Sequence, residues 1–175
     1  MSEPPAEPGR SGVAAGPRAA DGGIVVIGVG NEFRRDDGVG PQVLANLRTQ
    51  VADFVRLVRS DGEPARLIEA WTGASLAVVV DAVQGAAATA GLTHRIVVDQ
   101  AENEAEQVRA VSSHGLGLGA AIGLAQALDL MPHRLVVHAI EAVEFGFGVG
   151  LTPAIADAVE AVTAAILLDL AQACA

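Results

Sequence analysis

The stretch IVVIGVGNEFRRDDGVG, residues 24–40, decides the fold of this chain. Its first six residues are β-branched apart from one glycine, which is typical of a strand that is buried on both faces in a parallel sheet. The chain then turns and presents two adjacent carboxylates, Asp36 and Asp37, and a helix is predicted to begin at about Gly38. Ligands of open α/β sheets bind beyond the carboxyl ends of the strands. This first loop therefore predicts a functional site that contains acids.

Hydrophobic periodicity predicts alternating strands and helices along the rest of the chain. Further strands are predicted at residues 54–58, 76–83, 93–98 and 135–140, and helices at 38–51, 63–71, 115–128 and from Thr152-Pro153 onward, a pair typical of a helix start. About ten residues separate the third and fourth strands, which is too few for a parallel crossover. The fourth strand is therefore predicted to be antiparallel, at an edge. The predicted fold class is α/β, a three-layer α/β/α sandwich with a mixed, mostly parallel five-stranded sheet.

Composition limits the domain organisation and the classes of partner. Residues 1–23 are rich in Pro, Gly, Ala and Ser without periodicity, which predicts a disordered tail, and residues 24–175 are expected to form one domain. The net charge of −10 disfavours nucleic acid and anionic membrane surfaces as partners. The one cysteine, Cys174, excludes an intrachain disulfide framework and is typical of a reducing, cytoplasmic location. No apolar run has the length of a membrane span, and the N-terminus has no secretory signal.

Three side chains are expected to converge on one crevice. Asp37 follows the first strand, Asp81 lies near the end of the third, and His114 precedes a predicted helix. The first and third strands are predicted to be neighbours, so their carboxyl ends open on the same crevice. Two carboxylates and one imidazole form an open site for a divalent transition metal, with positions left for a substrate. Their spacing along the chain is long, and by itself it is a weak signal.

Several motifs resemble those of the hydrogenase maturation endopeptidases. The motif GNEFRRDDGVG at residues 30–40 resembles the signature of this family. Three further motifs resemble the family's later motifs in the same order, namely VVDAV at 79–83, SSH at 112–114 and GVGLTP at 148–153. One departure stands after the second strand, where residues 61–64 read DGEP instead of the family's frequent Gly-Gly-Thr-like turn. This departure bears on the fit of the substrate more than on the metal ligands.

The resemblance implies an endopeptidase that removes a C-terminal extension from the immature large subunit of a nickel–iron hydrogenase. It implies that nickel is supplied by this substrate, and that Asp37, Asp81 and His114 complete the coordination of that nickel. Water would then cleave the peptide bond, either polarised by the nickel or activated by a carboxylate, with Asp37 and Asp36 as the catalytic candidates. No organic cofactor is expected. The enzyme is expected to act as a monomer, since it must admit a large partner.

Alternative interpretations accompany each of these residues. Asp36 and Asp37 could cap the following helix, Asp81 could cap a loop at the end of its strand, and His114 could bond to backbone. His138 is predicted to be a core histidine with a partner, and His94 and His133 are predicted to lie at the surface. These alternatives concern the role of each residue and leave the predicted fold unchanged.

Other functions were weighed against the endopeptidase. The sequence GVG at residues 28–30 suggests a dinucleotide site, but Phe33 takes the place of its third glycine and the two acids would repel a pyrophosphate. A serine beside His114 does not by itself supply the geometry of a catalytic triad. A non-catalytic chaperone that binds nickel or metalloproteins, and a domain that binds phosphate or nucleotides, remain open as further functions.

Overall fold

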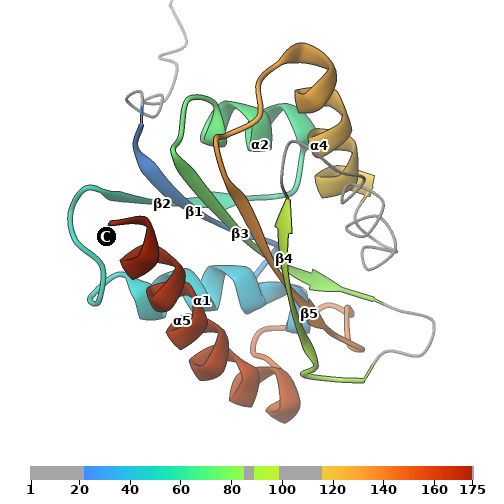
Figure 1. The fold of residues 1–175 in the computed structure, drawn as a ribbon. Coiled ribbons are helices and arrows are strands. Elements are labelled where there is room, and N and C mark those ends of the chain that lie inside the picture. Colours follow the sequence, from blue (N-terminus) through green and yellow to red (C-terminus); the bar gives the residue numbers. More distant parts are fainter. Residues whose placement is uncertain (1–21, 85–88, 99–115, 175) are drawn as a thin grey trace, which may run out of the picture.

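A computed structural model describes residues 22–84, 89–98 and 116–174 of the protein (Figure 1). In chain order the elements are β1 (Ile24–Val29), the 3-10 turn η1 (Arg35–Gly38), α1 (Val39–Leu47), β2 (Val55–Ser60), α2 (Pro64–Trp71), β3 (Leu76–Val83), β4 (Thr93–Val98), α4 (Leu116–Leu128), β5 (Leu135–Glu141) and α5 (Pro153–Ala173). Helices α1 and α5 cover one face of the sheet, and α2 and α4 cover the other (Figure 1). The predicted three-layer architecture is confirmed.

The five strands lie in the order β2-β1-β3-β5-β4. Strand β1 pairs in parallel with both β2 and β3, and β3 pairs in parallel with β5. Strand β4 is antiparallel to β5 at the edge, as the short connection before it predicted. The carboxyl ends of β1 and β3 are therefore neighbours, which is the arrangement on which the predicted site depends.

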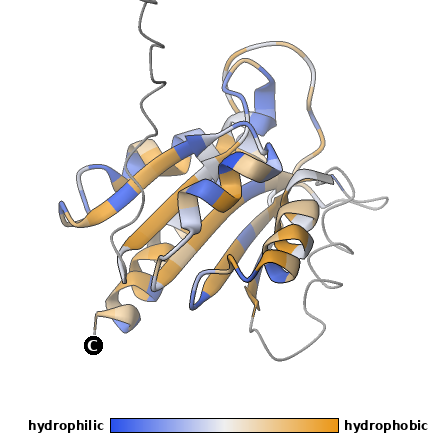
Figure 2. Cartoon of the chain, turned by 90° about the horizontal axis from the view of Figure 1, so that it is seen from above, coloured by the Kyte–Doolittle hydropathy of each residue, from blue (hydrophilic) through white to orange (hydrophobic). Residues whose placement is uncertain are grey.

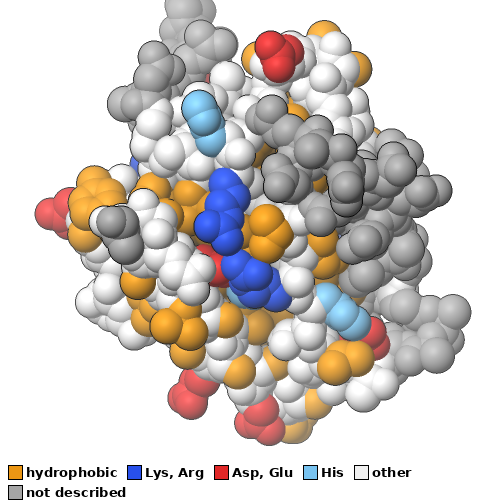
Figure 3. Space-filling view, viewed as in Figure 1, with side chains coloured by type: hydrophobic (Ala, Val, Ile, Leu, Met, Phe, Trp, Pro, Cys, Tyr) orange, Lys and Arg blue, Asp and Glu red, His pale blue; other side chains and the backbone are white. Residues whose placement is uncertain are grey.

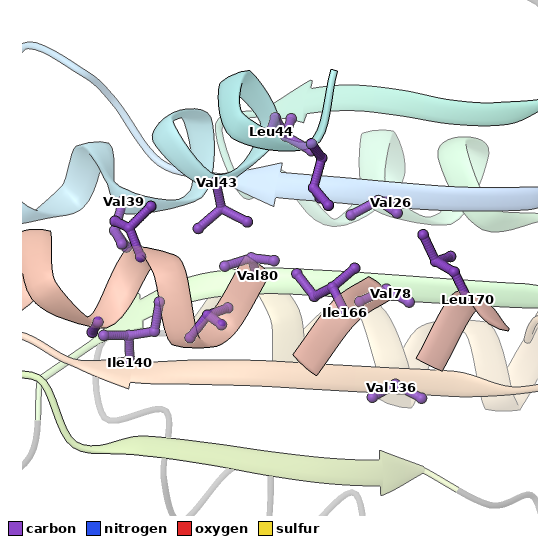
Figure 4. Packing of buried hydrophobic residues seen from close by; sticks show 14 of the residues in the cluster. Val26, Val39, Val43, Leu44, Val78, Val80, Val136, Ile140, Ile166 and Leu170 are labelled. Carbon is purple, nitrogen blue, oxygen red and sulfur yellow. The ribbon is translucent and has the colours of Figure 1, made fainter. Parts of the chain in front are cut away.

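Two apolar layers hold the helices against the sheet. Alternate residues of β1, β3 and β5 point to opposite faces, and every residue of β1 and β3 is buried. Figure 4 shows the layer beneath α1 and α5, in which aliphatic side chains of these helices meet those of the strands. Figure 2 shows that the strands are mostly hydrophobic, whereas the helices carry both hydrophobic and hydrophilic residues. The core consists mainly of Val, Ile, Leu and Ala, with Trp71 as its one large aromatic residue among the described residues.

Several predicted boundaries differ from the structure by one to four residues. Helix α1 ends at Leu47 instead of residue 51, because the backbone N–H groups of Gln50 and Val51 both close a turn onto the carbonyl of Leu47. Strand β2 runs two residues further than predicted, to Ser60, because polar side chains at an edge hide the apolar pattern. Helix α2, predicted over residues 63–71, begins at Pro64. The carboxylate of Glu63 accepts the N–H groups of residues 65 and 66, which makes it the cap of this helix.

A buried ionic cluster fixes α5 to the edge of the sheet. Asp169 of α5 is 4% exposed, accepts hydrogen bonds from the guanidinium of Arg95 on β4, and contacts His138 Nε2 of β5 at 2.9 Å. Burial alone raises the pKa of Asp169, but the bonds from Arg95 and His138 outweigh this, so its pKa lies below the ordinary value. Burial lowers the pKa of His138. The prediction that His138 is a core histidine with a partner is confirmed.

Two other histidines were predicted to lie at the surface. His133 is exposed. His94 is only one-third exposed, because its Nε2 contacts Glu141 Oε1 at 2.8 Å across the β4–β5 pair. On the face of the molecule shown in Figure 3, basic side chains gather near the centre and histidines lie to either side of them.

Candidate active site

The loop after β1 brings its backbone unusually close to the start of α1. Gly30 has φ +126°, and a Cβ at this position would lie 1.9 Å from the carbonyl oxygen of Asp37. Only glycine allows this approach and this backbone conformation. The turn is closed further by the carboxylate of Asp37, whose Oδ2 accepts the N–H of Asn31 at 2.9 Å. The loop therefore holds the Asp37 side chain half-buried at the carboxyl end of β1.

The neighbouring carboxylate of Asp36 points elsewhere. It is fully buried and accepts three hydrogen bonds, from the N–H of Glu144 at 3.2 Å and from the N–H and hydroxyl of Thr152 at 2.7 and 3.1 Å. Thr152 stands at the N-cap position of α5, as predicted, but its side chain makes no capping bond and its hydroxyl donates to Asp36. Asp36 thus pins the segment before α5 to the first loop. This placement does not support the catalytic role expected for Asp36.

Neither acid caps a helix through its side chain, so the capping interpretation is wrong for both. The N-cap residues of η1 and α1 are Arg34 and Gly38, and neither makes a side-chain capping bond. The two carboxylates instead have different roles. Asp37 lines a cavity, and Asp36 holds the loop that carries Asp37.

Asp81 lies in β3, on the face of the sheet that α2 and α4 cover. It is 7% exposed. Burial raises its pKa to about 7, and the negative charge of Asp37 adds to this rise. Asp37 and Asp81 are therefore close enough to interact electrostatically. A carboxyl with a pKa near neutrality in a cavity is typical of a functional site.

Asp37 and Asp81 line one cavity of about 290 Å³ at the carboxyl ends of β1 and β3. Three further residues that were not singled out from the sequence have chemistry suited to this cavity. These are Arg34, Asp61 and Phe145. The Nη2 of Arg34 donates to the carbonyl of Phe145 at 3.4 Å, which places a cation in a cavity lined by three aspartates.

A simple signal in the sequence points to Asp61. It directly follows β2 at the same edge of the sheet, so the rule that selected Asp81 also selects Asp61. No such signal existed for Phe145, which is more than a hundred residues from Arg34 along the chain.

His114, the third predicted ligand, lies outside the described residues. Helix α4 begins two residues later, and its Gly117 and Leu118 line the cavity. A Cβ on Gly117 would lie 2.1 Å from the carbonyl oxygen of Gly62, so the two backbones pack without room for a side chain. Among the described residues, no three His, Cys, Asp or Glu side chains are grouped so that they could hold a metal ion. The role of His114 therefore stays a prediction.

Exposed apolar side chains lie on the two segments that carry the cavity-lining residues Arg34 and Phe145, and we call them the apolar rim. Phe147 is 94% exposed, and Phe33 and Val149 are also exposed. Their two segments are joined, because Gly148 donates its N–H to Phe33 and accepts the N–H of Arg35. Phe145 lines the cavity and also packs against the core, while Phe33 and Phe147 are exposed on the segments next to it. Exposed aromatic residues are enriched in protein–protein interfaces.

Comparison with known proteins agrees with this geometry. The sequence model of the hydrogenase maturation protease family, HycI, matches residues 42–169, which is more than half of the chain. The chain belongs to the hydrogenase maturation protease family. The match begins after the first motif and includes Asp81 and His114. A comparison with curated proteins found no match.

Solved structures of this family have the same fold. The hydrogenase maturating endopeptidase HybD from E. coli superposes with a TM-score of 0.74 at 19% identity, over 86% of this chain and 93% of that chain. The [NiFe] hydrogenase maturation protease HybD from Thermococcus kodakarensis superposes with a TM-score of 0.68 at 22% identity, over 85% and 98%. The hydrogenase maturation protease HycI from the same archaeon has a TM-score of 0.56 at 23% identity, over 82% and 89%.

Family membership makes this protein an endopeptidase of hydrogenase maturation, as the resemblance predicted. The family implies processing of a hydrogenase large subunit. In the part of the chain that the structure describes, no helix is both long and apolar enough to span a membrane.

Proposed function

We propose that this protease removes the C-terminal extension from the nickel-loaded large subunit of a nickel–iron hydrogenase, and that it recognises the nickel of that substrate. One observation carries the proposal. Asp37, in the turn η1 that follows β1, and Asp81, on the adjacent parallel strand β3, line one cavity, close enough for the charge of Asp37 to raise the pKa of Asp81. Paired acids that repel each other are stabilised when a cation binds between them.

The proposed ligands are Asp37, Asp81 and His114. Two carboxylate oxygens and one imidazole nitrogen suit a divalent transition metal. Support for His114 comes from its place in the sequence, three residues before Gly117, which lines the cavity. Because a carboxylate must lose its proton to bind a metal, binding of the substrate's nickel also draws the proton from Asp81.

Cleavage itself requires a water molecule, a base or Lewis acid, and stabilisation of the developing oxyanion. Asp37 is half-buried and faces the cavity, so it is the base candidate that the geometry supports, while the substrate's nickel is the alternative means of polarising the carbonyl. The guanidinium of Arg34 lines the same cavity and is suited to stabilising negative charge. The buried Asp36 acts through position, by holding the loop that carries Asp37.

The proposed partner is the immature large subunit, met by a monomer in the cytoplasm. The apolar rim around Phe147 supports a protein substrate, because burial of so exposed an aromatic side chain against a partner contributes favourably to the free energy of binding.

The test is cleavage of a purified large-subunit precursor, followed on a denaturing gel. The proposal predicts that the nickel-loaded precursor is shortened and that the nickel-free precursor is not. Cleavage of both forms at equal rates would remove nickel recognition from the mechanism. If the loaded precursor binds but is never cut, the nickel-binding chaperone is the better description.

A further inference from the structure

The edge of the sheet at β2 has geometry suited to an added strand. Among the described residues β2 has one neighbouring strand, β1. The carbonyl of Ser60 accepts the N–H of Gly30, so it points toward β1. Backbone groups of successive residues in a strand point to opposite sides, and the N–H and C=O groups of Leu57 and Arg59 therefore face away from β1. An outward row of backbone donors and acceptors is a template for an extended chain.

Grooves flank this edge on both faces of the sheet. One of about 410 Å³ lies between β2 and α2, and a second of about 230 Å³ lies between β2 and α1. Residues 56 and 58 belong to the α2 face, and residues 57 and 59 to the α1 face. Side chains of an added strand alternate in the same way. They would fall in turn into the two grooves, which is how β-strand addition obtains specificity.

The two grooves are basic, although the chain as a whole is acidic. Their linings contain four arginines and one acid, while the whole chain has 11 basic residues and a net charge of −10. The arginines are Arg48, Arg56, Arg59 and Arg66, and the acid is Glu69. A ligand that carries carboxylates is thus complementary to this edge.

Acids outside the grooves already contact two of these arginines. Arg59 contacts Glu32, and Arg66 contacts Asp61, each at 3.2 Å. All four side chains are at least half exposed, and such pairs contribute little to stability. Arg56 donates to the carbonyl of Ala70. Carboxylates of a ligand can therefore replace Glu32 and Asp61 at small cost.

The edge leads directly into the active site. Ser60, the last residue of β2, lines the larger groove, and the next two residues, Asp61 and Gly62, line the cavity that contains Asp37 and Asp81. A chain that lies along β2 therefore has one end at the proposed site of cleavage.

We propose that the outer edge of β2 binds an extended, acidic segment of the protein substrate as an added strand, and so guides the scissile bond to the cavity. The identity of this occupant rests on the proposed function. The binding mode does not, because it follows from the edge, the grooves and the arginines.

Hydrogen exchange of the wild-type protein tests the binding mode. Two probes are added separately: a nickel-loaded large-subunit precursor, and a synthetic peptide in which valine and glutamate alternate. We expect amide hydrogen exchange over residues 55–60 to slow with either probe. A peptide in which valine and lysine alternate is expected to leave exchange over this range unchanged. Unchanged exchange over this range with both acidic probes would overturn the proposal, whether or not the precursor is cleaved.

Substitutions at Arg59, with one control at Arg134, separate charge from strand addition. Arg59→Glu is expected to raise the precursor's KM about tenfold with kcat nearly unchanged, whereas Arg134→Glu, before β5 at the opposite end of the strands, leaves both unchanged. Arg59→Pro removes an outward N–H that an edge strand does not need and is expected to weaken peptide binding more than Arg59→Gln does.

If Arg59→Glu behaves like Arg134→Glu while wild type cleaves, the docking edge is wrong and the proposed function stands. If wild type never cleaves but residues 55–60 are protected, the proposed function fails and the docking edge stands.

Discussion

Asp36 and Asp37 show how two adjacent, identical residues acquire different roles from their contacts. Asp36 accepts three hydrogen bonds in a fully buried position, and Asp37 accepts one from Asn31 at the mouth of the cavity. Their roles could not be separated from the sequence, because the partners of Asp36 lie 108 and 116 residues further along the chain. The presence of acids at the site was predictable from the sequence, but the separate roles of Asp36 and Asp37 were not.

Substitution of each acid is expected to separate stability from activity. Asp36→Ala leaves buried donors without an acceptor, so it should lower the free energy of unfolding by roughly 2–4 kcal/mol. Asp37→Ala loses one bond at a partly exposed position and should cost about 1 kcal/mol or less, yet abolish cleavage. Urea unfolding and the precursor assay measure the two effects. Equal losses of stability in both variants would contradict this division.

The charged form of Asp81 is expected to destabilise the folded protein above neutral pH. Its folded pKa of about 7 exceeds the ordinary value of 3.8, so the folded state binds more protons between these values and stability falls as the pH rises from about 4 to 7. Asp81→Asn should therefore gain stability over this window and keep a constant gain, on the order of 4 kcal/mol, above pH 7.

Urea unfolding between pH 5 and 8.5 checks this prediction. Asp53→Asn, at an exposed aspartate, is the matched control. A gain from Asp81→Asn that does not change with pH would show that burial of this charge is not costly.

At the scale of elements, the pattern of apolar residues was sufficient for most of the sheet. Strand β1 is apolar throughout and β3 is apolar except for Asp81, and the short link before β4 predicted its direction. The edges were harder, since β2 continues through the polar residues Arg59 and Ser60, and the start of α2 depends on one carboxylate at Glu63. Polar residues at an edge resemble a loop until their neighbours are known.

The cluster around Asp169 is expected to anchor α5. Asp169→Ala leaves Arg95 and His138 without their carboxylate and should lower the free energy of unfolding by roughly 3 kcal/mol. Because the pKa of Asp169 is below its ordinary value, its contribution is present above pH 4 and is lost as the pH falls through the folded pKa. Denaturation at pH 7 measures the effect. The matched control is Asp157→Ala at an exposed position of the same helix, and a similar small change in both variants would show that the cluster contributes little.

The contact between α4 and the loop after β2 is expected to shape the cavity. In Gly117→Ala the new methyl group would lie 2.1 Å from the carbonyl oxygen of Gly62, so the start of α4 must move away. We expect a stability loss of about 1–3 kcal/mol and a larger, separate loss of cleavage, since both glycines line the cavity. Cleavage at the wild-type rate by a destabilised variant would show that this contact does not position the site.

At the scale of the whole molecule, the acids were predictable and their surroundings were not. Asp81 follows from the rule that sites lie beyond the carboxyl ends of strands. Arg34 and Phe145 are 111 residues apart in the sequence and meet in the cavity only through the fold. His114 rests on the family motif alone, and we propose that it joins the site from the segment before α4.

The molecule as a whole carries its candidate site and its ionic cluster on opposite faces of the sheet. Asp81 of the cavity lies on the face that α2 and α4 cover, while His138, in register with the neighbouring Val80, contacts Asp169 of α5 on the other face. We propose that residues 24–175 act as one domain that carries all of these features.

The central claim is that Asp37, Asp81 and His114 together recognise the nickel of the substrate. The most direct measurement is cleavage of one nickel-loaded precursor by wild type and by Asp37→Asn, Asp81→Asn and His114→Gln, each first shown to be folded by circular dichroism. The account predicts cleavage by wild type alone, with Arg134→Gln as an active control. Cleavage that survives all three substitutions would contradict it.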